Sequence, residues 1–121
     1  MSELILIIED QEDNRRIMRD LLTSAGYEVI EAVTGESGVM SAETHRPDLI
    51  LMDIQLPDFD GYEATRRIKA NPALSSVPII AVTSYALSGD DVKAYEAGCD
   101  GYVSKPFSPR ELLKKIREFF A

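Results

Sequence analysis

Acidic and basic side chains stand directly after hydrophobic runs at several places in the chain. Glu9 and Asp10 follow the first run, Asp53 follows the third, and Lys105 follows the last. Carboxylate oxygens with no His or Cys nearby are the ligands that Mg²⁺ or Mn²⁺ prefers. A carboxylate can also attack phosphorus and form an acyl phosphate. If the fold brings these residues together, they predict a divalent-metal site, phosphoryl chemistry at Asp53, or both.

The charges of such a cluster need an outside partner. Carboxylates about 4 Å apart repel one another by roughly 1–4 kcal/mol per pair, and the single ammonium of Lys105 cannot neutralise three of them. A divalent cation can. Phosphoryl transfer to Asp53 would further need neutralisation of the phosphoryl oxygens. The metal, Lys105 and the hydroxyl of Thr83, which ends the fourth hydrophobic run, would supply it.

Short hydrophobic runs alternate with segments of helical period, which predicts the elements that must position these residues. We expect strands at 4–8, 28–32, 49–52, 79–82 and 102–104, and helices around 15–25, 36–45, 62–70, 90–97 and 109–120. Strands that alternate with helices form a parallel sheet, because each crossover returns the chain to the same end. The sequence therefore predicts an α/β fold.

The polarity of the runs predicts their order in the sheet. Runs 4–8, 49–52 and 79–82 are continuously apolar and belong in the middle, whereas 28–32 and 102–104 are partly polar and suit the edges. Numbered along the chain, the order is 2-1-3-4-5, a doubly wound, flavodoxin-like five-stranded parallel sheet with helices on both faces. In such sheets ligands bind where the strand order reverses, here between the strands that precede Glu9 and Asp53.

Helix stripes and caps complete the expected fold. Gly26 ends the first helix, and Ser108 with Pro109 and Glu111 begins the last one as a capping box. Asp60 and the Ser88-Gly89 pair are further expected caps. The buried face of the first helix is predicted to consist of Ile17, Met18, Leu21, Leu22 and Ala25, with Arg15, Arg16, Arg19 and Asp20 on the opposite, solvent face.

Composition excludes several classes of protein. The chain has 121 residues, so we expect one domain, 1–121, with no output domain. Its net charge of −8 and its pI near 4.6 predict that it does not bind nucleic acid. Cys99 is the only cysteine, which rules out an intrachain disulfide and favours a reducing, cytoplasmic location. No apolar run approaches the roughly 20 residues of a membrane span, so no membrane insertion is expected.

Taken together, the motifs resemble the receiver domain of two-component response regulators, the CheY-like family, from Leu4 to Phe119. They are Ile8-Glu9-Asp10, Pro47-Asp48-Leu49-Ile50-Leu51-Met52-Asp53, Pro57, Gly61, Ala81-Val82-Thr83 and Ser104-Lys105-Pro106. The segments 51–57 and 97–100 are similar to single-domain regulators of the DivK kind and to receivers of hybrid kinases.

The resemblance implies a role for each matching residue. Asp53 would accept a phosphoryl group from a histidine of a kinase or phosphotransfer protein. Glu9 and Asp10 would hold Mg²⁺, with the main-chain carbonyl of Gln55 completing the metal site. Lys105 would pair with the phosphoryl group, and its peptide bond to Pro106 would be cis.

The resemblance also implies a switch and an output. Thr83 and Tyr102 would be the switch pair, and a downstream protein would bind the face formed by the fourth helix, fifth strand and fifth helix. Ser84 departs from the alanine usual at that position. Gln55 and Tyr85 occupy positions that influence water access, and with it the lifetime of the phosphorylated form.

Other interpretations stay open on the residues alone. The chain could be a receiver excised from a hybrid histidine kinase or multidomain regulator, or a receiver acting only as a scaffold. A small Mg²⁺-dependent phosphatase would need a second acid where Gln55 stands, and a flavin binder would need a glycine-rich loop where Glu9 to Asp13 stand. We therefore expect that the protein is not an enzyme and catalyses only its own phosphorylation and dephosphorylation. Tyr102 could be an ordinary edge-strand aromatic, and Cys99 a small buried hydrophobe.

Overall fold

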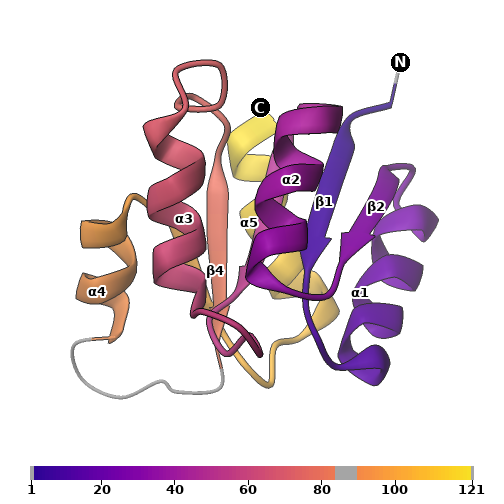
Figure 1. Ribbon diagram of the computed structural model, residues 1–121. Helices are drawn as coiled ribbons and strands as arrows, with labels where there is room; N and C mark the ends of the chain where they lie inside the picture. Colours follow the sequence, from indigo (N-terminus) through magenta and orange to yellow (C-terminus); the bar gives the residue numbers. More distant parts are fainter. Residues whose placement is uncertain (1, 84–89, 121) are drawn as a thin grey trace.

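Strands and helices alternate along the described part of the chain, as the sequence predicted. The computed structural model describes residues 2–83 and 90–120. The elements in order are β1 (Leu4–Ile8), α1 (Glu12–Ser24), β2 (Glu28–Ala32), α2 (Gly35–His45), β3 (Leu49–Asp53), α3 (Gly61–Ala70), β4 (Ile79–Thr83), α4 (Asp90–Ala97), β5 (Gly101–Ser104) and α5 (Pro109–Phe120) (Figure 1). Ser84, Tyr85, Ser88 and Gly89, each singled out in the sequence, lie outside the described residues.

The sheet confirms the predicted topology. Its five strands are parallel and lie in the order β2-β1-β3-β4-β5. Along the β1–β3 pair, Ile8 stands opposite Met52. The next residue on each strand is an acid, so the register alone brings Glu9 and Asp53 side by side at the point where the strand order reverses.

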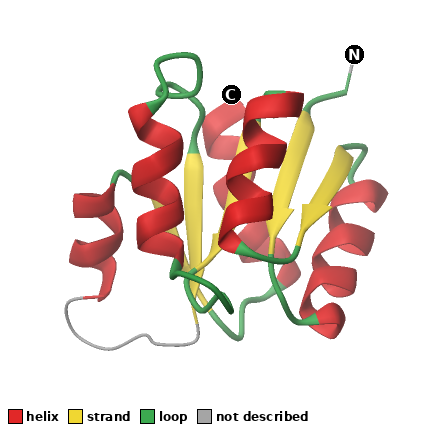
Figure 2. Ribbon diagram, viewed as in Figure 1, coloured by secondary structure: helices red, strands yellow, loops and turns green. Residues whose placement is uncertain are grey.

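Helices cover both faces of the sheet, which makes three layers (Figure 2). On one face, Ala42 of α2, Ile68 of α3 and Ala94 of α4 join the core formed by alternate strand residues. On the other face, Leu22 of α1 and Ile116 of α5 pack against the remaining strand residues. Since the three central strands are buried on both sides, their continuous apolar runs are explained. No helix in the described part of the chain has the length and apolar character needed to cross a membrane.

The buried face of α1 is narrower than predicted. Met18 and Leu22 are buried, and Leu21 is partly buried, but Ile17 is 55% exposed and Ala25 is also exposed. A helix resting on a sheet at its margin buries little more than its i, i+4 row, and Ile17 lies about 100° around the helix from Met18. The prediction that Ile17 and Ala25 face the core was therefore wrong.

Three of the helix ends predicted from the sequence show the expected cap. Asp60 accepts a hydrogen bond from the Glu63 N–H at 2.9 Å, and Ser108 accepts one from Glu111 at 3.1 Å. Gly26 has a φ of 96°, the left-handed conformation expected just after the end of α1. The Asp60 and Ser108 caps fix where two loops from the carboxyl edge of the sheet enter α3 and α5, whereas Gly26 lies at the opposite edge, before β2.

Hydrogen bonds at two places hold the loop between β3 and α3. Asp58 accepts hydrogen bonds from the backbone N–H groups of Gly35 and Glu36 at 2.8 and 2.9 Å, at the start of α2. The Gly61 N–H donates to the Ile54 carbonyl at 2.8 Å. A Cβ at position 61 would overlap the carbonyl oxygen of Asp53, so only glycine allows this close approach. The loop that follows Asp53 is thereby held against the site.

Candidate functional site

Three carboxyl groups gather beyond the ends of β1 and β3. One oxygen from each of Glu9, Asp10 and Asp53 lies within 4.8 Å of the others. Glu9 is fully buried and Asp53 is 4% exposed, whereas Asp10 is exposed. Buried carboxylates require partners, so the surroundings of Glu9 and Asp53 decide what the site can hold.

Lys105 is shared by the two buried carboxyl groups. Its Nζ lies 2.6 Å from Oε1 of Glu9 and 3.3 Å from Oδ1 of Asp53. The Lys105 N–H donates to the Thr83 carbonyl at 2.7 Å, and the peptide bond to Pro106 is cis, as the resemblance implied. One ammonium between three carboxyl groups leaves the cluster short of positive charge.

The pKa of Asp53 reflects this shortage. Burial, followed by the neighbouring carboxyl of Glu9, raises the pKa of Asp53 to about 7, although Lys105 acts in the opposite direction. Without a metal the carboxyl is therefore protonated far more easily than an ordinary aspartate. A divalent cation would favour the ionised form, and the all-oxygen donor set suits Mg²⁺ or Mn²⁺. The residues present thus fit the metal that the sequence predicted.

The remaining predicted residues lie around this centre. The Gln55 N–H approaches Oδ1 of Asp53 at 3.4 Å, which places its main chain at the rim of the site. Thr83 is 1% exposed at the end of β4, opposite Ser104 in the β4–β5 register. Tyr102 is half-buried on β5, where it pairs with Ala81 and packs on the core that includes α4.

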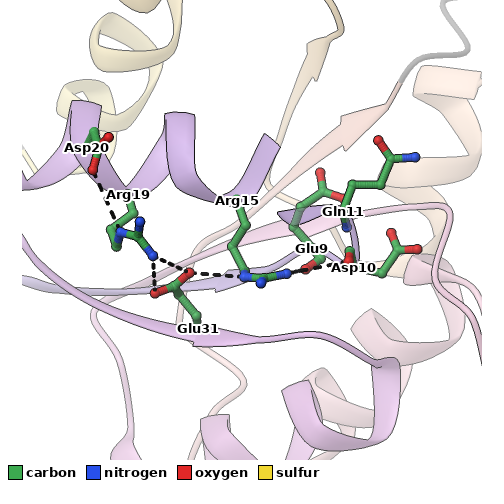
Figure 3. Close-up of polar contacts among 7 residues, drawn as sticks. All are labelled: Glu9, Asp10, Gln11, Arg15, Arg19, Asp20 and Glu31. Carbon is green, nitrogen blue, oxygen red and sulfur yellow. Dashed lines mark hydrogen bonds and ion pairs between the residues drawn. The ribbon is translucent and has the colours of Figure 1, made fainter. Parts of the chain in front are cut away.

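The site also contains a contact that the sequence did not predict. Arg15, expected on the solvent face of α1, donates from Nη1 to the carbonyl oxygens of Glu9 and Asp10 at 3.1 and 3.4 Å. Its Nε pairs with Glu31 of β2 at 3.1 Å (Figure 3). The signal available in the sequence was a cation five residues after Asp10 and six after Glu9, in the first turns of the next helix.

A family model and a curated relative match the chain over most of its length. The model described as "Response regulator receiver domain" matches residues 5–117. The polar-differentiation response regulator DivK of Brucella anthropi is 41% identical over 119 residues, which cover 98% of this chain and 97% of that protein.

Solved structures agree with these matches. The receiver domain of the sensor histidine kinase PA1611 from Pseudomonas aeruginosa is 41% identical and superposes with a TM-score of 0.92, covering 98% of both chains. Its crystal structure has a magnesium ion coordinated in the active-site cleft. The chemotaxis protein CheY4 of Vibrio cholerae is 26% identical, with a TM-score of 0.93 over 98% of this chain and 99% of that one. Motifs, topology and relatives agree, and the chain belongs to the response regulator receiver domain family of two-component signalling proteins.

Proposed function

We propose that this protein is a phosphorylation-dependent switch in a two-component system or phosphorelay. Asp53 accepts a phosphoryl group from a phosphohistidine of a histidine kinase or histidine phosphotransfer protein. Glu9, Asp10, Asp53 and the main-chain carbonyl of Gln55 hold Mg²⁺. The observation that carries the proposal is the cluster of three carboxyl oxygens within 4.8 Å beside one shared ammonium.

The proposed chemistry is a single transfer. An oxygen of the Asp53 carboxylate forms a bond to phosphorus while the bond from phosphorus to the donor imidazole nitrogen breaks, and that nitrogen keeps the electron pair. Bound Mg²⁺ supplies charge neutralisation for the carboxylates and the phosphoryl oxygens. Lys105, already within 3.3 Å of Asp53, pairs with a second phosphoryl oxygen, and the Thr83 hydroxyl donates to a third.

The switch follows from the change in charge at Asp53. Phosphorylation gives the side chain a charge of about −1.5 to −2, so Thr83 and Lys105 gain a stronger partner. Charge-assisted hydrogen bonds contribute about 1.5–3 kcal/mol each, so two of them shift a two-state equilibrium by about four decades at most. Thr83 and Tyr102 belong to paired strands, and Tyr102 turns inward when the Thr83 hydroxyl moves toward the phosphoryl group.

The proposed output surface is the face formed by α4, β5 and α5. An open groove of about 310 Å³ runs along β5 and α5, lined by Tyr102, Val103, Ser104, Glu111, Lys114, Lys115 and Glu118. The residue assigned to the switch thus lines the groove itself. A downstream protein that binds there would distinguish phosphorylated from unphosphorylated Asp53. No contact with nucleic acid is part of the proposal.

Two settings for this switch share the same chemistry. The protein acts as a stand-alone cytoplasmic receiver, a role supported by the similarity to nearly the full length of DivK. The alternative is a receiver that belongs to a larger kinase, supported by the equal identity to the PA1611 receiver. A phosphatase acting on external substrates is disfavoured because Gln55 stands where a second acid is needed, and p-nitrophenyl phosphate should not be turned over.

The test is labelling with acetyl phosphate and Mg²⁺, followed by intact-mass spectrometry. The wild-type protein should gain one phosphoryl group that hydroxylamine removes, as expected of an acyl phosphate. Asp53→Asn should gain none, and chelation of the metal should prevent labelling. Equal labelling of Asp53→Asn would refute the assignment of the phosphoacceptor.

The donor is tested by phosphotransfer profiling. Purified histidine kinases and phosphotransfer proteins, each loaded with labelled phosphate on histidine, are mixed briefly with the receiver. One or a few donors should transfer much faster than the rest, and only to protein that retains Asp53. Transfer from none of them, in protein that acetyl phosphate does label, would contradict a phosphohistidine donor.

A further inference from the structure

We propose that Arg15 is a positioning residue for the metal site: it holds the backbone of the Glu9-Asp10 pair so that both carboxylates face the cation, and Glu31 holds Arg15. This inference rests on the proposed function, because it assigns a new residue to the proposed Mg²⁺ site. Among the described residues of the site, Arg15 contacts the backbone carbonyl oxygens of Glu9 and Asp10 and no carboxylate of the cluster.

The backbone of the acid pair lies just past the end of β1. The last bond toward β2 is that of the Glu9 N–H to the Ala32 carbonyl at 3.0 Å, and α1 begins only at Glu12. Between these two elements, Nη1 of Arg15 bridges the carbonyl oxygens of Glu9 and Asp10. Asp10 is exposed, so its side chain has little packing of its own to orient it. The bridge therefore restrains the segment on which the direction of the Asp10 carboxylate depends.

Arg15 is in turn restrained from the opposite side. Its Nε contacts Oε1 of Glu31 at 3.1 Å, and Arg19 contacts both oxygens of the same carboxylate at 3.3 and 3.2 Å (Figure 3). The Arg15 side chain is 17% exposed and that of Glu31 is 27% exposed. A planar guanidinium held on two sides is a rigid support, because its donors have fixed directions.

The charge of Arg15 and its proposed positioning role predict opposite effects of its removal on Mg²⁺ binding, so the role can be tested. A guanidinium close to a cation site weakens cation binding by repulsion. If Arg15 acted only through its charge, its removal would tighten Mg²⁺ binding. If it acts by positioning the acid pair, its removal weakens binding, since the loss of groups that orient metal ligands costs about 10–100-fold in affinity.

The experiment measures the Mg²⁺ dissociation constant by amide NMR shifts or calorimetry, at constant ionic strength and without any phosphodonor. Arg15→Ala should bind Mg²⁺ about tenfold more weakly than the wild-type protein. Arg16→Ala is the matched control: Arg16 is the neighbouring cation on α1 but pairs with Asp13 at 3.1 Å, away from Glu31, so its removal should change the affinity less than about twofold. Binding to Arg15→Ala that equals or exceeds wild-type binding would overturn the proposal.

Two further variants keep the test decisive if Arg15→Ala does not fold. Arg15→Lys retains the charge but not the planar fork, and should bind Mg²⁺ several-fold more weakly. Glu31→Gln removes the group that holds Arg15 and should also weaken binding. Wild-type affinity in both variants would refute the positioning role. A wild-type protein that binds no Mg²⁺ would instead contradict the proposed function, so the two failures are distinguishable.

Discussion

The chemistry of Asp53 depends on how far its surroundings favour or oppose ionisation of its carboxyl. The side chain is almost fully buried, and the Glu9 carboxyl stands beside it. Both conditions oppose ionisation, and Lys105 offsets them only in part because it is shared with Glu9. A divalent cation would favour the ionised form of this carboxyl, so the proposed phosphorylation of Asp53 is linked to metal binding at a single residue.

The raised pKa of Asp53 predicts a pH-dependent stability without metal. The folded state binds the Asp53 proton more tightly than the unfolded state, with a pKa of about 7 against the ordinary 3.8. The contribution of this residue to stability is thus complete below about pH 4 and is lost as the pH rises toward 7. Asp53→Asn should be more stable than the wild-type protein at pH 7.5 by on the order of 1–3 kcal/mol, with little difference at pH 4.

Urea denaturation at several pH values, with the metal chelated, measures this difference. An equal free energy of unfolding for the two proteins at pH 7.5 would show that Asp53 ionises in the folded state as easily as in the unfolded one. Glu43→Gln, at an exposed acid of α2 away from the site, controls for the general effect of removing a negative charge.

The proposed role of Lys105 predicts that its removal impairs signalling more than phosphorylation. Lys105→Ala keeps Asp53 and the acids proposed to bind the metal, so acetyl phosphate should still label it, at an equal or lower rate. The variant lacks the ammonium that is proposed to pair with the phosphoryl group, so the NMR shifts of β5 and α5 should change far less than in phosphorylated wild-type protein. Full changes in the phosphorylated variant would count against this role of Lys105.

At the scale of the elements, the site depends on the close contact between the start of α3 and the end of β3. The backbone of Gly61 lies against the Asp53 carbonyl, and Asp58 ties the intervening loop to α2. Burial raises the pKa of Asp58, but hydrogen bonds from the Glu36 and Gly35 backbone outweigh it, and the pKa lies below its ordinary value. The loop is therefore fastened most firmly when Asp58 is ionised, which is the case at neutral pH.

Gly61→Ala tests the contact between α3 and β3. The new Cβ would overlap backbone rather than a flexible side chain, so we expect a loss of about 1–3 kcal/mol in the free energy of unfolding. Slower labelling by acetyl phosphate should accompany it, because the backbone of Asp53 must shift. Gly26→Ala should cost about 1–2 kcal/mol for its left-handed backbone but leave the labelling rate unchanged. Wild-type labelling in Gly61→Ala would show that this contact does not position Asp53.

These elements and most of the site were predictable from the sequence, for an identifiable reason. Parallel strands end at one edge, so the acids that follow two neighbouring strands must meet there, as Glu9 and Asp53 do. The contacts of Arg15 were not predictable, because a long side chain on a helix surface finds its partners only once the tilt of the helix is fixed. The same cause explains the error at Ile17: periodicity gives a helix face, but packing decides its width. The switch role of Tyr102 stays a prediction.

At the scale of the whole molecule, an acidic protein concentrates negative charge at one edge of its sheet. The net charge is −8, and the cluster of Glu9, Asp10 and Asp53 adds a local excess of negative charge. Mg²⁺ should therefore act in two ways: weakly, by screening the overall charge, and specifically, by binding the folded state at Glu9, Asp10 and Asp53.

The specific effect predicts that Mg²⁺ stabilises the fold. At a Mg²⁺ concentration about ten times the dissociation constant, the free energy of unfolding should rise by about 1.4 kcal/mol. Asp53→Asn should gain less, and NaCl at equal ionic strength should reproduce only the screening component. Denaturation with and without each salt measures both components. Equal stabilisation by the two salts would mean that no specific metal site forms.

The most direct measurement of the central claim is a crystal structure of the protein grown with Mg²⁺ and beryllofluoride, a mimic of the phosphoryl group. We predict Mg²⁺ bound to oxygens of Glu9, Asp10 and Asp53 and to the Gln55 carbonyl. Beryllium should be attached to Asp53, with its fluorides in contact with Lys105 and Thr83. A structure with no metal among these carboxylates and no beryllofluoride on Asp53 would contradict the account.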